Sequence, residues 1–139
     1  MPRITPLRLS LAALALTASA TMAASLPPLA DNARVQREFL AVAVGDEIRK
    51  NCPSISARFF YVMRKASDLE SYALSLGYTQ DDISAMRKDP ANKARLKALR
   101  DEYLTVNGVV PDDKESYCRL GRLEIEGKTL IGSLIWSRQ

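Results

Sequence analysis

The sequence predicts an all-α fold, a compact bundle of about five helices cross-linked by one disulfide. Three observations predict it. Apolar residues recur at the three- and four-residue spacing of helices, capping residues and glycines stand at the ends of those segments, and the 139-residue chain has only two cysteines. An α+β fold with a small C-terminal hairpin is the alternative, because one segment near the C-terminus also fits paired strands.

Residues 1–23 have the pattern of a secretory signal peptide. Arg3 and Arg8 precede an apolar run, LSLAALALTASATMAA, that ends in small residues. We expect cleavage after Ala23, with cleavage after Ala20 as the alternative. An uncleaved anchor is disfavoured, because the run is shorter and more polar than the roughly 20 apolar residues of a membrane-spanning helix. The rest of the sequence has no second run of sufficient length, so we expect no integral membrane span after cleavage.

Residues 24–139 are then expected to form a single helical domain. Loss of Arg3 and Arg8 lowers the formal net charge from +4 to +2, and the remaining charges are interspersed along the chain. Proteins that bind nucleic acid present clustered Lys and Arg, so we expect no nucleic-acid partner. A chain of this size buries one modest core and gains stability from a cross-link.

Two helices are predicted in the first half of this domain. Asp31 or Asn32 caps a helix that runs to Lys50, where the sequence NCP interrupts it. The second is the clearest in the chain, an apolar seam over about 22 residues with Ser54 at the N-cap and Gly77 after the end. We favour a core helix over a coiled-coil or partner interface, since three heptads are marginal for a coiled coil. The seam consists of Ile55, Phe59, Val62, Ala66, Leu69, Ala73 and Leu76.

Two further helices follow. Thr79 caps a short one, and Asp89 caps a longer one that has Pro90 at its first position and Gly108 after its end. The apolar stripe of the longer helix consists of Leu96, Leu99, Tyr103 and Val106.

The segment 122–134 is ambiguous. Its leucine spacing fits a helix, but Leu123 and Ile125 alternate with glutamates, and Gly127 with the lysine after it fits a two-residue hairpin turn. We favour helix, because an isolated hairpin is marginally stable. The spacing of Gly121, Gly127 and Gly132 indicates close helix approach or helix breaks.

Cys52 and Cys118 are the two cysteines, and export carries cysteines to an oxidising compartment. We predict a disulfide between them, with intermolecular pairing or a free reactive thiol as alternatives. A closed loop of this length stabilises a fold by about 4 kcal/mol in the chain-entropy model. The pair does not form a C-x-x-C redox motif, and a structural zinc site needs four Cys or His ligands.

The sequence contains no histidine, which excludes Ser-His-Asp and Cys-His catalysis. Carboxylate chemistry remains, but Glu124 and Glu126 diverge if they lie on a helix. The other acidic pairs stand where helix caps are expected. We therefore predict no catalytic residues, no cofactor and no metal site.

The segments IRKNCP, LGYTQDDI and YCRLGRLEIEGKTLIGSLI carry a resemblance to known proteins. Over Leu40 to Trp136 the chain resembles a family of small exported proteins of Gram-negative bacteria, catalogued only as a domain of unknown function. The resemblance implies a periplasmic location and one shared compact domain. It assigns no activity, so it carries over no catalytic residues.

The function expected from these observations is a non-enzymatic periplasmic domain that binds or scaffolds a protein partner, whose identity the sequence does not indicate. The alternative is a small-ligand-binding or enzyme-inhibitor module, and a carboxylate-dependent hydrolase is a less favoured one. The predicted partner or ligand surface consists of the aromatic residues Phe59, Phe60, Tyr61, Tyr72 and Trp136.

Overall fold

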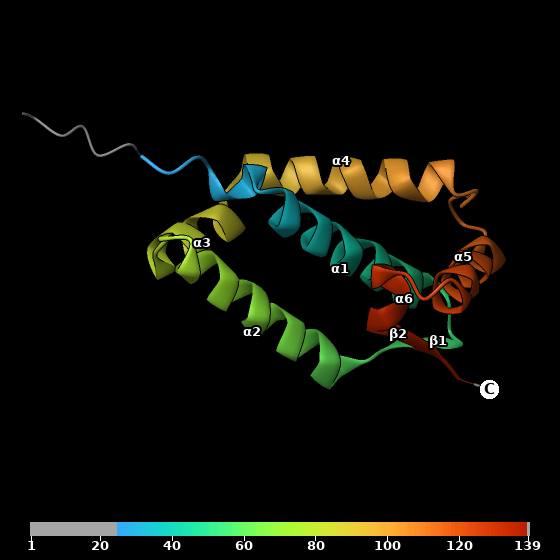
Figure 1. The fold of residues 1–139 in the computed structure, drawn as a ribbon. Helices are drawn as coiled ribbons and strands as arrows, with labels where there is room; N and C mark the ends of the chain where they lie inside the picture. The colour runs from blue at the N-terminus through green and yellow to red at the C-terminus, as the bar shows by residue number, and fades with distance from the viewer. Residues whose placement is uncertain (1–24, 139) are drawn as a thin grey trace, which may run out of the picture.

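The computed structural model describes residues 25–138, and their architecture confirms the all-α class, with six α-helices and a small two-stranded sheet (Figure 1). The predicted signal peptide, residues 1–23, lies outside the described residues. The elements are η1 (Leu29–Asp31), α1 (Ala33–Asn51), β1 (Ile55–Ala57), α2 (Phe59–Ser75), α3 (Gln80–Lys88), α4 (Pro90–Val106), α5 (Lys114–Glu126), α6 (Leu130–Leu134) and β2 (Ile135–Ser137).

Helix α1 is the centre of the molecule. Its predicted cap is confirmed, since the Asn32 side chain accepts hydrogen bonds from the backbone N–H groups of Arg34 and Val35. Helix α4 packs along one side of α1, and α5 and α6 also pack against it. Helix α2 leaves the sheet and runs at an angle to α1 on the other side (Figure 1).

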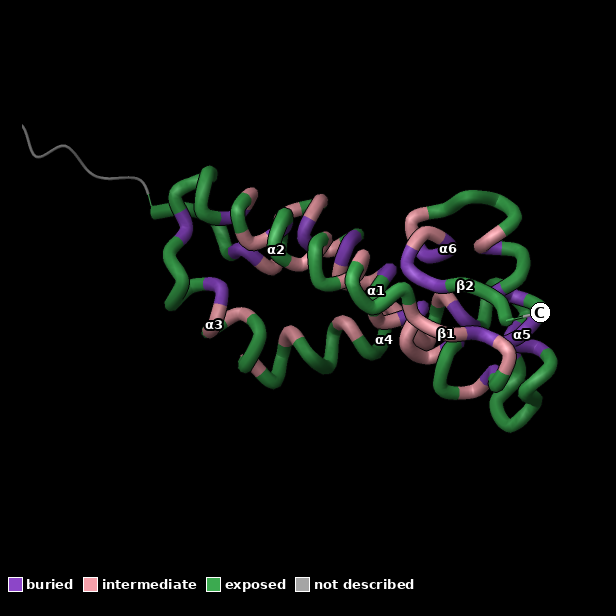
Figure 2. Tube along the Cα trace, turned by 90° about the horizontal axis from the view of Figure 1, so that it is seen from below, coloured by how far each residue is buried: buried purple, intermediate pink, exposed green. Residues whose placement is uncertain are grey.

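The larger of two buried clusters lies where α1, α5, α6 and the sheet meet, and it contains the disulfide. The Cys52–Cys118 bond, with an S–S distance of 2.04 Å, joins the C-terminal cap of α1 to α5. This confirms the predicted pairing. Figure 2 shows buried stretches around these elements, whereas along α2 and α4 exposed residues alternate with intermediate ones.

Two glycines allow the close packing of this cluster. A Cβ at Gly121 would stand 2.2 Å from Ile55 Cδ1 and 2.8 Å from Ile48 Cγ2, and a Cβ at Gly132 would stand 2.0 Å from the Glu124 carbonyl oxygen. The predicted close approach is thus confirmed at both positions. The third glycine of that group, Gly127, caps the C-terminus of α5.

The prediction of a helix that starts at Ser54 is wrong, because α2 begins at Phe59. The residues before it form β1, which pairs antiparallel with β2 so that Ile55 lies opposite Ser137. Backbone N–H of Arg58 extends this pairing by donating to the Leu134 carbonyl oxygen at 2.8 Å. The side chain of Ile55, which is 2% exposed, thereby reaches the core from a strand. At the other end of α2, Gly77 has φ +95° as predicted.

The helical interpretation of residues 122–134 is confirmed, and the hairpin alternative does not form. Helix α5 continues to Glu126, and α6 begins after Thr129, whose side chain caps it. The stripe predicted for α4 is wrong at one position, because Val106 is 73% exposed while Leu104 is buried. The chain turns at Gly108, with φ +77°, so that Val109 takes the buried place.

Within residues 25–138, no helix combines the length and the apolar character that crossing a bilayer requires.

Candidate functional site

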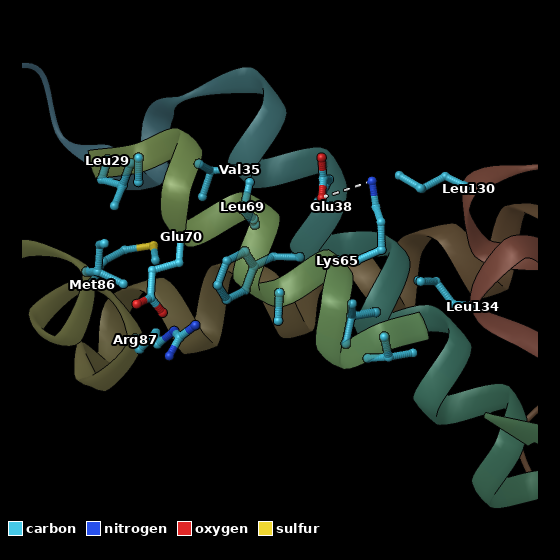
Figure 3. A pocket seen from close by; sticks show the side chains of 16 residues that line it. Leu29, Val35, Glu38, Lys65, Leu69, Glu70, Met86, Arg87, Leu130 and Leu134 are labelled. Carbon is cyan, nitrogen blue, oxygen red and sulfur yellow. Dashed lines mark ion pairs between the residues drawn. The ribbon is translucent and has the colours of Figure 1, made fainter. Parts of the chain in front are cut away.

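A groove lies between α1 and α2, and it is more enclosed than the two larger but shallower hollows beside η1 and β1. It encloses about 380 Å³, and α3 and α6 contribute side chains at its two ends (Figure 3). Both long walls are apolar and repeat the four- and three-residue spacing of a helix face. The α1 wall consists of Val35, Phe39 and Val42, and the α2 wall of Val62, Ala66 and Leu69.

The groove exists because α2 is held at its ends more than along its middle. At the N-terminal end, α2 follows directly from β1, which pairs with β2. At the C-terminal end, Leu69 and Ala73 join a small buried cluster with Leu29 and Ile83. Tyr78 ties this cluster to the start of the domain, since its hydroxyl donates to the Pro27 carbonyl oxygen at 2.7 Å. The turns between these ends therefore leave their apolar side chains facing the groove.

An ion pair lies in the wall of the groove. The Glu38 carboxylate has a side chain only 10% exposed and accepts a hydrogen bond from Arg34 Nε at 2.9 Å. Lys65 Nζ of α2 approaches the same carboxylate at 3.8 Å (Figure 3). The hydrogen bond with Glu38 raises the pKa of Arg34, so this guanidinium stays charged. The pair places charge of both signs between the apolar walls, and Glu70 and Arg87 add one charge of each sign towards α3.

The apolar lining continues towards α4. A smaller cavity of about 70 Å³ lies between α1, α3 and α4, and it shares Val35, Phe39 and Met86 with the groove. Leu96 and Leu99 of α4 line its far side. Met86 lines both the groove and this cavity, and a methionine side chain adapts its shape readily.

The groove is not lined by any of the five aromatic residues that the sequence indicated as a partner or ligand surface. Phe59 and Phe60 are exposed at the start of α2, with ring centroids 5.6 Å apart in an edge-to-face arrangement. Trp136 is 42% exposed on β2. The structure therefore brings these three residues to the same end of the molecule, beside the sheet.

The two tyrosines of that set lie elsewhere. Tyr61 is partly buried against the larger core cluster. The Tyr72 ring lies beneath the Arg34 guanidinium, with Cζ 4.3 Å from the ring centroid, and its hydroxyl accepts a hydrogen bond from Asn32 Nδ2 at 3.4 Å. Both tyrosines thus contribute to packing.

Sequence reasoning missed the groove residues as a site, although it identified several of them. The α2 wall belongs to the predicted seam, and the α1 wall lies on the helix that was predicted to run to Lys50. The periodicity showed which side chains share a face, but it contains no signal for how far apart two faces stand.

Glu124, the buried carboxylate outside the groove among the described residues, has structural partners. Glu124 is 5% exposed and accepts hydrogen bonds from the hydroxyls of Tyr103 and Thr129. Glu126, two residues later on α5, is exposed and diverges from Glu124 around the helix. Burial and the hydrogen bond to Glu124 raise the pKa of Tyr103 to about 12. The two glutamates therefore do not converge as an acid–base pair.

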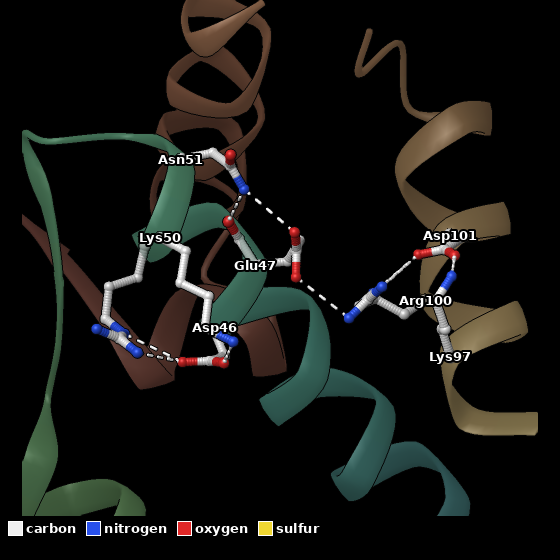
Figure 4. Close-up of polar contacts among 8 residues, drawn as sticks. Asp46, Glu47, Lys50, Asn51, Lys97, Arg100 and Asp101 are labelled. Atoms are coloured by element: carbon white, nitrogen blue, oxygen red, sulfur yellow. Dashed lines mark hydrogen bonds and ion pairs between the residues drawn. The ribbon is translucent and has the colours of Figure 1, made fainter. Parts of the chain in front are cut away.

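A cluster of charged and polar side chains links α4 to α1 (Figure 4). Arg100 Nη1 lies 3.1 Å from Glu47 Oε2, and Arg100 Nη2 lies 2.7 Å from Asp101 Oδ1. Hydrogen bonds from Lys97 and Arg100 lower the pKa of Asp101. Asn51 donates to Glu47 from the next turn of α1. These contacts stabilise the α1–α4 pair.

The described part of the chain contains no group of three or more Cys, Asp or Glu side chains arranged to hold a metal ion.

Comparison with known proteins gives one match. A family model described as "Family of unknown function (DUF5333)" matches residues 27–136, which extends the resemblance found in the sequence towards the N-terminus. No curated protein and no solved structure matches the chain.

Proposed function

We propose that the chain, which belongs to the DUF5333 family of unknown function, is an exported, non-enzymatic periplasmic domain that binds a partner protein in the groove between α1 and α2. The partner segment is an amphipathic helix that places its apolar side chains in the groove. The groove itself is the observation that carries this proposal.

The spacing of the walls supports a helical guest. Val35, Phe39 and Val42 on one side, and Val62, Ala66 and Leu69 on the other, repeat the same interval. An amphipathic helix presents anchors at i, i+3, i+4 and i+7, which match such a pair of walls. A volume of about 380 Å³ accommodates several apolar side chains without opening the core.

The charged pair supports a defined orientation of the guest. Lys65 and Glu38 stand at one position along the groove, and their 3.8 Å separation is longer than that of a hydrogen-bonded pair. A polar side chain on the partner helix can hydrogen-bond to Lys65 without displacing Arg34 from Glu38. Such contacts contribute specificity more than affinity.

A non-enzymatic role is favoured by the chemistry available. The sequence has no histidine, and the buried Glu124 is occupied by Tyr103 and Thr129. The groove is lined by two acidic and two basic residues, Glu38, Glu70, Lys65 and Arg87, and by no Ser, Thr, Cys or Tyr side chain that could act as a nucleophile.

Export is supported by the leader-like N-terminus and by the disulfide, which forms and persists in oxidising compartments. In cells that express the full chain, we expect the protein in the osmotic-shock fraction, with a mass that corresponds to a start at Ala24. We also expect Cys52 and Cys118 to resist alkylation until they are reduced. A cytoplasmic protein with alkylatable thiols would contradict this part of the proposal.

The groove is tested by site-specific photo-crosslinking. A photoreactive phenylalanine replaces Val42, which is 43% exposed on the α1 wall, and in a matched control it replaces Val110, which is 56% exposed outside the groove. We expect a discrete crosslinked protein from position 42 only. Adding Ala66→Phe, which fills the groove, is expected to abolish that product while the melting temperature changes little. Equal crosslinking from both positions, or none from position 42, would show that no partner protein binds in the groove.

A small apolar ligand is the second candidate. It is favoured by one observation, namely that side chains of α3 and α6 stand at both ends of the groove and limit the length of a guest. Native mass spectrometry of the purified protein distinguishes the two. An adduct of a few hundred daltons that disappears in Ala66→Phe, with no crosslinked protein at position 42, would assign the groove to a small ligand.

A further inference from the structure

The sheet end of the molecule leaves large apolar side chains in solvent. Phe60 is 87% exposed, Phe59 64%, Met63 54% and Trp136 42%. Phe59 and Phe60 open α2, and Met63 follows one helical turn later on the same side. Trp136 lies on β2 opposite Ser56 of β1, the strand that leads directly into α2. These four side chains form an apolar edge that the described residues leave uncovered.

The same end is basic. No Asp or Glu occurs between Glu47 and Asp68, a stretch that contains five Lys and Arg residues. Some of these are neutralised within the fold. Asp46 pairs with the two basic residues that open the stretch, Arg49 and Lys50. Lys65, which closes it, lies 3.8 Å from the buried Glu38.

Three arginines at this end have no carboxylate partner among residues 25–138. Arg58 Nε donates to the Ile135 carbonyl oxygen at 3.1 Å, and Arg138 Nε donates to Ser56 Oγ at 2.8 Å. The Arg64 guanidinium lies over the Tyr61 ring, 5.3 Å from its centroid. Each guanidinium has five N–H donors, so most of their donors remain free for an anion.

Arginine and aromatic side chains line the same surface feature at this end of the molecule. Arg138 and Phe59 line one shallow hollow beside β1, so a guanidinium and an aromatic ring border the same depression. Asp46 also lines this hollow, and its carboxylate is paired with Arg49 and Lys50. Aromatic rings prefer the interfacial region of a bilayer, and arginines prefer the phosphate groups above it. A protein hot spot, by contrast, fills a pocket on its partner and is ringed by further contacts.

We propose that this aromatic–basic edge, made of Phe59, Phe60, Met63 and Trp136 with Arg58, Arg64 and Arg138, docks on an anionic phospholipid surface. The rings enter the interface and the three guanidiniums bind lipid phosphates. Binding is peripheral, since none of the described helices is long and apolar enough to span a bilayer. This surface is separate from the α1–α2 groove, which none of its residues lines.

The single tryptophan makes the test site-specific. Trp136 is the only Trp of the chain and belongs to the edge, so its emission reports contact with lipid. Protein purified from cells that express the full chain is titrated with vesicles of equal parts phosphatidylglycerol and phosphatidylcholine, or of phosphatidylcholine alone. We expect a blue shift and co-sedimentation with the anionic vesicles, and weaker binding at high salt because the charges are exposed.

Two matched pairs of variants locate the binding surface. Phe60→Ala is expected to lower vesicle affinity about tenfold or more, because a phenylalanine ring is withdrawn from the apolar interface. Val106→Ala, which shortens another exposed apolar side chain, 73% exposed on α4, is expected to leave affinity unchanged. Arg64→Gln is expected to lower affinity about fivefold, whereas Arg37→Gln, at an exposed position of α1, leaves it unchanged. Both edge positions are exposed, so their variants retain the fold.

Several results would overturn the proposal. Equal affinity for both vesicle types, or no blue shift with either, would exclude anionic lipid as the partner. Equal effects of Phe60→Ala and Val106→Ala would exclude the edge as the docking surface. A protein partner that is lost in Phe60→Ala and Arg64→Gln, in the absence of vesicle binding, would assign the edge to a protein interface.

Discussion

Among changes that keep every core side chain in place, breaking the Cys52–Cys118 bond is expected to lower the free energy of unfolding the most. The bridge spans 66 residues and joins the end of α1 to α5, so it encloses β1, α2, α3 and α4. In the chain-entropy model a loop of that length raises the free energy of unfolding by about 4 kcal/mol. For a domain of this size that corresponds to a change in melting temperature of about 15 °C.

The measurement is urea unfolding of three forms: the oxidised protein, the reduced protein, and Cys52→Ala/Cys118→Ala. The reduced protein keeps both sulfurs and isolates the cross-link, and the difference between it and the alanine variant reports the packing lost at two buried positions. The m value should rise on reduction, because the uncrosslinked unfolded chain exposes more surface. Ser54→Ala, which removes a hydroxyl 3.2 Å from Cys52 Sγ, controls for local polar contacts and should cost little. A reduced protein within about 1 kcal/mol of the oxidised one would refute the loop-entropy reasoning.

Three further predictions concern single side chains. Gly132→Ala is expected to cost about 3 kcal/mol in urea unfolding, since its Cβ meets the backbone of Glu124 at 2.0 Å; a cost below 1 kcal/mol would contradict that packing. Asn32→Ala should lower the free energy of unfolding by about 1 kcal/mol, because two backbone N–H groups of α1 lose their acceptor. The control is Asn107→Ala, at the C-terminal cap of α4. The pKa of Tyr103 is raised to about 12 in the fold, above that of an unfolded tyrosine. The contribution of Tyr103 to the free energy of unfolding is therefore full below about pH 10 and is lost as the pH rises towards 12. Tyr103→Phe should flatten the alkaline loss of stability, and an unchanged pH profile would disprove the assignment.

Local signals predicted most of the helices correctly. The caps of Asn32, Thr79 and Asp89 each appear where the sequence placed them, because a side-chain acceptor at a helix start acts within a few residues. The glycines at 121 and 132 were also informative, since absence of a Cβ is a local property with a direct packing consequence. The disulfide was predicted from the count of two cysteines and from the expected export alone.

Long-range pairing accounts for what was missed. Ile55 fits the helical seam in register, yet it lies on β1 because β2, some 80 residues later, supplies the opposing backbone. Nothing between Ser54 and Phe59 signals that partner. Val106 was misplaced for a related reason, since the turn at Gly108 determines which side chain next reaches the core.

The seam of α2 connects these omissions to function. An amphipathic helix is stable when its apolar face is covered, but within the described residues α2 is buried only at Leu69 and Ala73, towards its C-terminal end. The remaining seam divides in two. Val62 and Ala66 face the groove, and Phe59 stands at the aromatic–basic edge. Helix α2 thus carries more apolar surface than residues 25–138 cover. This surface faces two directions, one nearly neutral and one basic. A single partner on one surface leaves the other exposed. We therefore expect Ala66→Phe to spare vesicle binding and Phe60→Ala to spare crosslinking at position 42, and loss of both activities in either variant would show that the two surfaces serve one binding event.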